Sequence, residues 1–134
     1  MSAPFTFELV SPEKLLFNQP VKMVTVPGSL GEYGVLAGHA PMITEIKPGV
    51  IRIYADNDAM VTSRLFVSGG FAEVTQTRFT VLATEATPVS ELNKEEINNQ
   101  AKDVAAKLAA STDADRDALL AQQEVIMAKL QAVA

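Results

Sequence analysis

The sequence predicts a mainly β domain followed by a pair of helices, and the distribution of residue types along the chain indicates this division. All seven glycines lie between Gly28 and Gly70, and all seven prolines lie at or before Pro88. The six Phe and two Tyr residues all lie at or before Phe79. From residue 89 onward the chain is rich in Ala, Leu, Lys, Glu and Gln, which favour helices. We therefore expect a β domain over residues 1–88 and a helical domain over residues 89–134.

Short segments of strand composition fill the first domain, and turn residues separate them about every 8–12 positions, which is typical of an antiparallel sandwich or barrel. Phe5, Phe7 and Leu9 alternate with polar residues, so one face of this strand is expected in the core. The nine expected strands span residues 5–10, 15–17, 21–26, 34–36, 41–46, 50–55, 64–67, 71–74 and 78–83.

The first expected helix begins after Asn93, whose side chain can cap it while Glu96 reaches back to complete a capping box. Leu92 and Ile97 have the spacing of a hydrophobic staple. The apolar stripe of this helix is expected to contain Ile97, Ala101, Val104, Ala105 and Leu108.

The second expected helix follows a break at Ser111, Thr112 and Asp113. Its first turn is expected to hold Asp113, Asp115 and Asp117, with Lys129 near its end, as the helix dipole favours. Its apolar stripe is expected to contain Leu119, Ile126, Leu130 and Val133. Two antiparallel helices with narrow, Ala-rich stripes bury little area, so we expect modest stability for the pair.

Composition excludes several classes of function. A chain of 134 residues with 48% apolar and 20% charged residues is typical of a globular protein. The absence of cysteine excludes disulfides, cysteine-ligated zinc and thiol catalysis. The net charge of −5 opposes binding to nucleic acid. The start of the chain lacks the pattern of a signal peptide, and no segment has the ~18 consecutive apolar residues of a membrane-spanning helix.

The stretch GSLGEYGVLAGHAPMITEIKPG, residues 28–49, is the most glycine-rich part of the chain and contains the single histidine, His39. Its glycine spacing fits neither of the common phosphate-binding motifs, and strand-like residues rather than a helix follow it. His39 lacks the nucleophile and orienting acid of a catalytic constellation, so we expect it to hydrogen-bond within its loop. We expect no enzymatic activity, metal or cofactor, and a role in binding and positioning other proteins.

Five segments together resemble the N-terminal domain of epsilon subunits of F-type ATP synthases, from Phe5 to about Ala86. These are LVSPEKLLF, VTVPGSLGEYGVLAGHAPMIT, IKPGVIRI, FVSGGFAEV and FTVLA. The resemblance implies a flattened ten-stranded β-sandwich followed by an α-helical hairpin. It also implies a non-catalytic rotor subunit of the central stalk, which couples rotation of the membrane c-ring to ATP synthesis in the proton-translocating complex.

The same resemblance implies partners and contact residues. The partners are the gamma subunit and the c-ring, with the beta subunits reached through the hairpin. The implied partner-binding residues are Gly31, Glu32, Tyr33, Gly34, His39, Ala40, Pro41 and Met42. Glu32 is favoured as a polar contact, the alternative being a solvated turn residue. The implied structural glycines are Gly28, Gly38, Gly49, Gly69 and Gly70, the last two forming a bulge where a strand begins.

Two departures from the family affect regulation. Some members bind ATP through an [IL]-D-x-x-R-A motif, whereas this chain has Leu92, then Asn93 for the acid, and Glu96 for the arginine before Ile97. A carboxylate there repels phosphate, so ATP binding by this motif is not expected. The family's hairpin can also inhibit ATP hydrolysis through basic residues. Residues 91–134 contain five basic and eight acidic residues, a net charge of −3, so we expect weak inhibition.

Two other functions stay open at this point: an ATP-sensing regulatory subunit with the same fold, and, much less favoured, a free-standing β-sandwich hydrolase that uses His39. The absence of a transit-like leader favours a peripheral location at the cytoplasmic face of a bacterial inner membrane, with the stromal side of a chloroplast thylakoid as the alternative.

Overall fold

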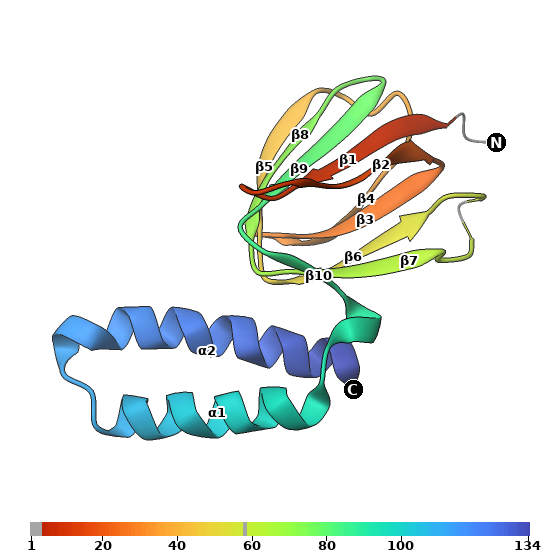
Figure 1. The fold of residues 1–134 in the computed structure, drawn as a ribbon. Coiled ribbons are helices and arrows are strands. Elements are labelled where there is room, and N and C mark those ends of the chain that lie inside the picture. The colour runs from red at the N-terminus through yellow and green to blue at the C-terminus, as the bar shows by residue number, and fades with distance from the viewer. Residues whose placement is uncertain (1–3, 58) are drawn as a thin grey trace. The chain divides into compact units, whose positions relative to one another are not determined.

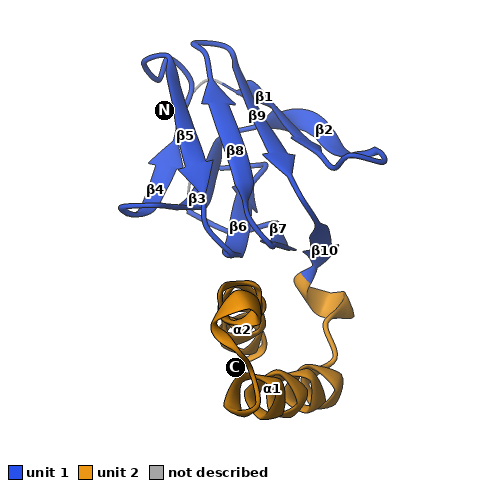
Figure 2. Cartoon of the chain, turned by 90° about the vertical axis from the view of Figure 1, so that its left-hand side faces the viewer, with its two compact units in different colours: residues 1–88 blue, residues 89–134 orange. Residues whose placement is uncertain are grey.

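The chain forms two compact units, residues 1–88 and residues 89–134 (Figure 2). A computed structural model describes residues 4–57 and 59–134. The described strands all belong to the first unit, and the second unit contains one short 3-10 helix and two α-helices.

Ten strands form the first unit, and the pairing that joins them is continuous (Figure 1). Their bounds are β1 Phe5–Val10, β2 Leu15–Val21, β3 Met23–Gly28, β4 Gly31–Val35, β5 Met42–Ile46, β6 Gly49–Tyr54, β7 Ser63–Val67, β8 Gly70–Val74, β9 Arg78–Ala83 and β10 Ala86–Pro88.

The sheet folds back on itself as a sandwich. Its strand order is β10-β7-β6-β3-β5-β8-β9-β1-β2, and β4 pairs with β3 beside this path. Strands β5, β8, β9, β1 and β2 form one layer, and β4, β3, β6, β7 and β10 form the other (Figure 1). A single residue pair, Gly28 with Ile46, joins β3 to β5 where the sheet passes between the layers. The expected β-sandwich followed by two helices is therefore confirmed.

Alternate residues of the strands meet between the layers as the pleat requires. Phe5, Phe7 and Leu9 of β1 are buried, and so are Phe79 and Val81 of β9, as the alternation predicts. The ring of Phe7 lies 5.5 Å from the rings of both Phe17 and Phe79, measured between ring centres. The other buried members of this core are Val21, Val24, Val26, Val35, Ile46, Ile51, Ile53, Val67, Ala72, Val74 and Ala83.

Three details of the sheet differ from the expectation. Strand β10 has no counterpart among the nine expected strands, because it is three residues long and ends in Pro88. Strand β2 continues through the polar residues Asn18 and Gln19 and through Pro20, which an edge strand tolerates. The sheet is not purely antiparallel, because β1 pairs with β9 in parallel.

The second unit contains a 3-10 helix at Val89–Glu91 and two α-helices, α1 at Lys94–Ala109 and α2 at Asp113–Val133. The side chain of Asn93 accepts a hydrogen bond from the backbone N–H of Glu96 at 3.1 Å, as expected of the cap. Ile97, Val104 and Ile126 form the buried centre of the unit. The residues that pack against this centre are Leu92, Ala101, Leu108, Leu130 and Val133.

Three expectations for the helices were wrong in detail. Ala105 is exposed instead of belonging to the apolar stripe, because the stripe advances in steps of four and three residues from Ile97 to Leu108. Leu119 is half-buried but is not among the residues that pack against the buried centre. The first turn of α2 holds Asp113 and Asp115 but not Asp117, whereas Lys129 lies near the end of the helix as expected. Within the described part of the chain, no helix is long and apolar enough to cross a membrane.

Candidate partner-binding surface

The glycine-rich stretch forms a tight hairpin between β3 and β4. Gly28 pairs with Gly31, so Ser29 and Leu30 make up the whole turn. Gly31 has a φ of 126°, a conformation that residues with a side chain rarely adopt. The turn leaves the side chain of Leu30 fully exposed at its tip, with a relative exposure of 103%. Leu30 is not among the residues expected from the sequence, where only its place between two turn glycines could have indicated it.

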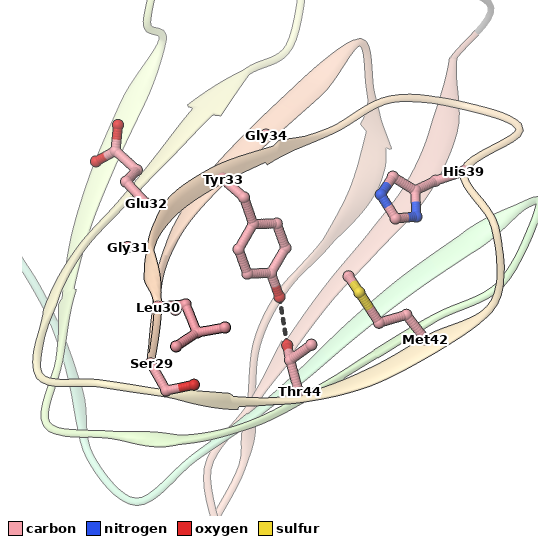
Figure 3. Close-up of a pocket in the computed structure, with 10 residues that line it drawn as sticks. Ser29, Leu30, Gly31, Glu32, Tyr33, Gly34, His39, Met42 and Thr44 are labelled. Carbon is pink, nitrogen blue, oxygen red and sulfur yellow. Dashed lines mark hydrogen bonds between the residues drawn. The ribbon is translucent and has the colours of Figure 1, made fainter.

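A pocket of about 370 Å³ lies beside this hairpin (Figure 3). Within it, the hydroxyl groups of Tyr33 on β4 and Thr44 on β5 are hydrogen-bonded to one another, which joins the hairpin to the neighbouring strand. The pocket is lined by Gly28, Ser29, Leu30, Gly31, Glu32, Tyr33, Gly34, His39, Met42 and Thr44. It brings together six of the eight partner-binding residues expected from the sequence. The other two, Ala40 and Pro41, are exposed and do not line it.

The carboxylate of Glu32 points away from the ring of Tyr33 (Figure 3). It accepts a hydrogen bond from Nη1 of Arg52 on β6 at 2.6 Å. The two side chains are 52% and 38% exposed, so water screens this ion pair. Glu32, the residue expected to make a polar contact with a partner, thus already forms an ion pair within the chain.

The loop that contains His39 is held by hydrogen bonds of its own. Nδ1 of His39 lies 2.8 Å from the backbone carbonyl oxygen of Ala40, which accepts a hydrogen bond from the ring. The backbone N–H of Gly38 donates to the carbonyl of Gln76 at 3.0 Å, and that of His39 donates to the carbonyl of Leu36 at 3.3 Å. In the part of the chain that the structure describes, no group of three or more His, Cys, Asp or Glu residues could hold a metal ion.

Of the other glycines singled out in the sequence, Gly70 has the strictest requirement. Its φ is 155°, and a Cβ atom placed on it would lie 2.0 Å from the carbonyl oxygen of Leu82. Gly70 begins β8, directly after Gly69, which also has a positive φ. Gly28 ends β3, Gly49 begins β6, and Gly38 lies in the loop before β5.

A row of apolar side chains crosses the outer face of the layer that contains β8 and β9. Phe71 of β8 is paired with Leu82 of β9, which is paired in turn with Val10 of β1 and then Leu15 of β2. Ile43 of β5 lies diagonal to Phe71 on the same face, because Ile43 pairs with Glu73. We call Ile43, Phe71, Leu82, Val10 and Leu15 the apolar row. Ile43, Phe71 and Leu82 are 73%, 58% and 57% exposed. These five residues are not among the site residues expected from the sequence.

The residues that correspond to the family's ATP motif stabilise the beginning of α1. Leu92 and Ile97 pack in the core of the second unit, and Asn93 caps the helix. Glu96 is exposed in the first helical turn. These positions therefore have structural roles that do not require a nucleotide.

Comparison with known proteins shows the class of protein to which this chain belongs. Residues 4–89 match the family model described as the β-sandwich domain of the ATP synthase Delta/Epsilon chain. The chain is 49% identical to the ATP synthase epsilon chain of Rhodospirillum centenum, and the match covers 100% of this chain and 94% of the relative. It is 48% identical to the epsilon chain of Paramagnetospirillum magneticum, with 100% and 98% covered.

Solved structures agree. A chain in the cryo-EM structure of the Euglena gracilis mitochondrial ATP synthase, described as OSCP/F1/c-ring, matches with a TM-score of 0.87 and 25% identity. The match covers 98% of this chain and 82% of that one. A chain of the Tetrahymena thermophila enzyme shares the fold at a TM-score of 0.69 and 13% identity, with 99% and 98% covered. The chain belongs to the ATP synthase epsilon chain family and is a non-catalytic subunit of that enzyme.

Proposed function

We propose that this chain is a rotor subunit of the central stalk, which transmits rotation of the c-ring to the catalytic head of the ATP synthase. In this proposal the apolar row docks on the gamma subunit, and the β3–β4 hairpin faces the polar loops of the c-ring. The chain itself binds no substrate and forms no bond. It acts peripherally, at the cytoplasmic face of a bacterial inner membrane, through its partners.

The apolar row is the observation that carries the proposal. Single exposed apolar side chains are ordinary on a protein surface, but a contiguous set indicates a contact with another molecule. Here the pairing of four adjacent strands places Phe71, Leu82, Val10 and Leu15 side by side. A firm layer of β-sheet supports this row, because the opposite faces of β8, β9 and β1 are in the core. Such a surface suits a contact that must stay in place under torque.

The β3–β4 hairpin supports the second contact. Its two-residue turn carries Leu30 outward, and the hydrogen bond between Tyr33 and Thr44 ties it to β5. The ion pair between Glu32 and Arg52 ties it to β6. A hairpin held on two sides presents a fixed edge to a partner, so that little ordering is needed when the contact forms. The proposed contact region also contains Gly31, Gly34, His39, Ala40, Pro41 and Met42.

We also propose that the helical unit inhibits ATP hydrolysis weakly. Its net charge of −3 over residues 91–134 opposes binding to an acidic element of a beta subunit. In the assembled enzyme, deletion of residues 89–134 is expected to change the ATPase rate by less than about twofold. A severalfold rise in that rate would contradict this part of the proposal.

Proton pumping by the reconstituted enzyme tests the main proposal. An ATP synthase assembled in vesicles without this chain is expected to pump protons poorly when given ATP, and addition of the full chain restores pumping. The Phe71→Ser/Leu82→Ser variant is expected to fail in this restoration. The Met60→Ser/Met127→Ser variant is the matched control, because it also removes two side chains that are more than half exposed. Equal restoration by both variants would contradict a role for the apolar row.

A further inference from the structure

Two carboxylates stand among the exposed side chains of the apolar row. Glu45 of β5 is paired with Phe71, and Glu73 of β8 is paired with Ile43. We infer that Glu45 and Glu73 select a partner surface in which basic side chains flank an apolar centre, and that the gamma subunit presents this surface. The inference rests on the proposed function, since it assigns the chemistry by which the same face recognises the same partner.

The pairing of β5 with β8 produces a checkerboard. Along each strand the outward positions are two residues apart, so Ile43 and Glu45 share a face with Phe71 and Glu73. Each carboxylate is therefore directly opposite an apolar side chain and diagonal to the other carboxylate. Both glutamates are exposed. A partner that covers Ile43 and Phe71 must also cover Glu45 and Glu73.

Covering a carboxylate removes water from it, which is unfavourable unless a cation or hydrogen-bond donors replace the water. Within residues 4–57 and 59–134, no ion pair or side-chain hydrogen bond engages either carboxylate. The ion pairs of the described residues include those of Arg52 with Glu32, Arg78 with Glu8, and Lys107 with Asp103, and none of these involves Glu45 or Glu73. The compensating groups for Glu45 and Glu73 must therefore come from the partner.

Glu8 provides the contrast within the same layer of the sheet. It lies on β1, on the outer face, and Nη1 of Arg78 contacts its carboxylate at 3.1 Å. The hydroxyl of Thr80 also donates to it at 3.4 Å. The carboxylate next to the β9–β1 pair is thus neutralised by this chain, whereas the two on β5 and β8 are left for a partner.

Exposed charges of this kind act mainly on the rate and orientation of encounter. The paired carboxylates attract a basic surface, and their position at one end of the apolar row, on β5 and β8, distinguishes that end from the end at Leu15. The partner can then bind in one orientation only. A symmetrical apolar surface without these charges would not supply that selection.

Association kinetics with the cognate gamma subunit, measured with the full chain at low and high salt, test the inference. The Glu45→Gln/Glu73→Gln variant removes both charges and keeps the size of the side chains. We expect its association rate constant to fall about tenfold at low ionic strength. At ~0.5 M salt the difference from the unmodified chain should nearly vanish, because salt screens the attraction. Charge reversal in Glu45→Lys/Glu73→Lys should slow association further at low salt.

The Glu95→Gln/Glu124→Gln variant is the matched control, with the same change of net charge on exposed positions of α1 and α2. Its rate constant should stay within about twofold of the unmodified chain, as expected for charges that are not part of the proposed contact. If the Glu45→Gln/Glu73→Gln variant behaves like this control, the inference is wrong. In that case, loss of binding in the Phe71→Ser/Leu82→Ser variant would still support the proposed docking of the apolar row. If that variant also binds normally, both the inference about the glutamates and the proposed docking are wrong.

Discussion

The carboxylate of Glu32 on β4 and the guanidinium of Arg52 on β6 meet at 2.6 Å. Strand β3 pairs with both of their strands, so the ion pair spans three adjacent strands. It fixes the outer side of the glycine-rich hairpin, while the hydrogen bond between Tyr33 and Thr44 fixes the side toward β5. The hairpin is therefore held by side chains on both of its flanks.

The ion pair is expected to contribute little to stability. In a double-mutant cycle with Glu32→Gln and Arg52→Gln, we expect a coupling of about 0.2–1 kcal/mol, because both side chains are partly exposed. Urea unfolding followed by tyrosine fluorescence measures it, since Tyr33 and Tyr54 both lie in the first unit. The coupling should shrink at high salt. A coupling above about 2 kcal/mol would show that the pair is better shielded than its exposure indicates.

Substitution of Gly70 is expected to destabilise the β-sandwich strongly. In Gly70→Ala the new Cβ would lie 2.0 Å from the carbonyl oxygen of Leu82, at a φ of 155°. We expect a loss of ~3 kcal/mol or more in the free energy of unfolding. Gly34→Ala is the matched control, because its nearest neighbour would be the sulfur of Met23 at 3.6 Å, an ordinary contact. The control should change stability by less than about 1 kcal/mol, and equal losses in the two variants would refute the explanation.

The helical unit is expected to be less stable than the sandwich, because only Ile97, Val104 and Ile126 form its buried centre. In the unmodified chain, amides of α1 and α2 should exchange with solvent faster than those of β1 and β9. Ile126→Ala should lower the local stability of the helices by about 2–3 kcal/mol and accelerate their exchange. Met127→Ala changes a neighbouring side chain that is 55% exposed, and it should have little effect. Helices as well protected as the strands would contradict this prediction.

ATP is not expected to bind to the helical unit. The Asn93 side chain is occupied in capping α1, and Glu96 places a negative charge where the family motif has an arginine. Calorimetry of the full chain with millimolar ATP and Mg²⁺ should give no saturable heat. The Asn93→Asp/Glu96→Arg variant has the acid and the arginine of the family motif, and its heat of ATP binding is compared with that of the unmodified chain. Saturable binding by the unmodified chain would support an ATP-sensing role instead.

The fold could be predicted in most of its parts, for physical reasons that differ between elements. The alternation at Phe5, Phe7 and Leu9 identifies β1, and Asn93 identifies the start of α1, because the pleat and the helix cap are local features. The parallel pairing of β1 with β9 could not be predicted in the same way. It joins residues more than seventy positions apart, and alternation is the same in parallel and antiparallel strands.

The candidate site was predicted less completely. The hairpin residues Gly31 to Gly34 were selected because they lie in a segment that resembles the family. The structure places them around one pocket with Thr44, which was not selected. The apolar row could not be predicted from the sequence, because each of its five residues comes from a different strand. Phe71 and Leu82 become neighbours only through the pairing of β8 with β9. Glu32 was selected without its partner, because nothing local connects it to Arg52.

Binding of the full chain to its cognate gamma subunit, measured by gel filtration and calorimetry at moderate salt, tests most directly whether the apolar row docks on the stalk. We expect a stable one-to-one complex for the unmodified chain and for Met60→Ser/Met127→Ser. We expect no complex at micromolar concentrations for Phe71→Ser/Leu82→Ser, with the variant's own fold verified by circular dichroism. A complex of unchanged affinity with that folded variant, or no complex with the unmodified chain, would show that the apolar row does not dock there.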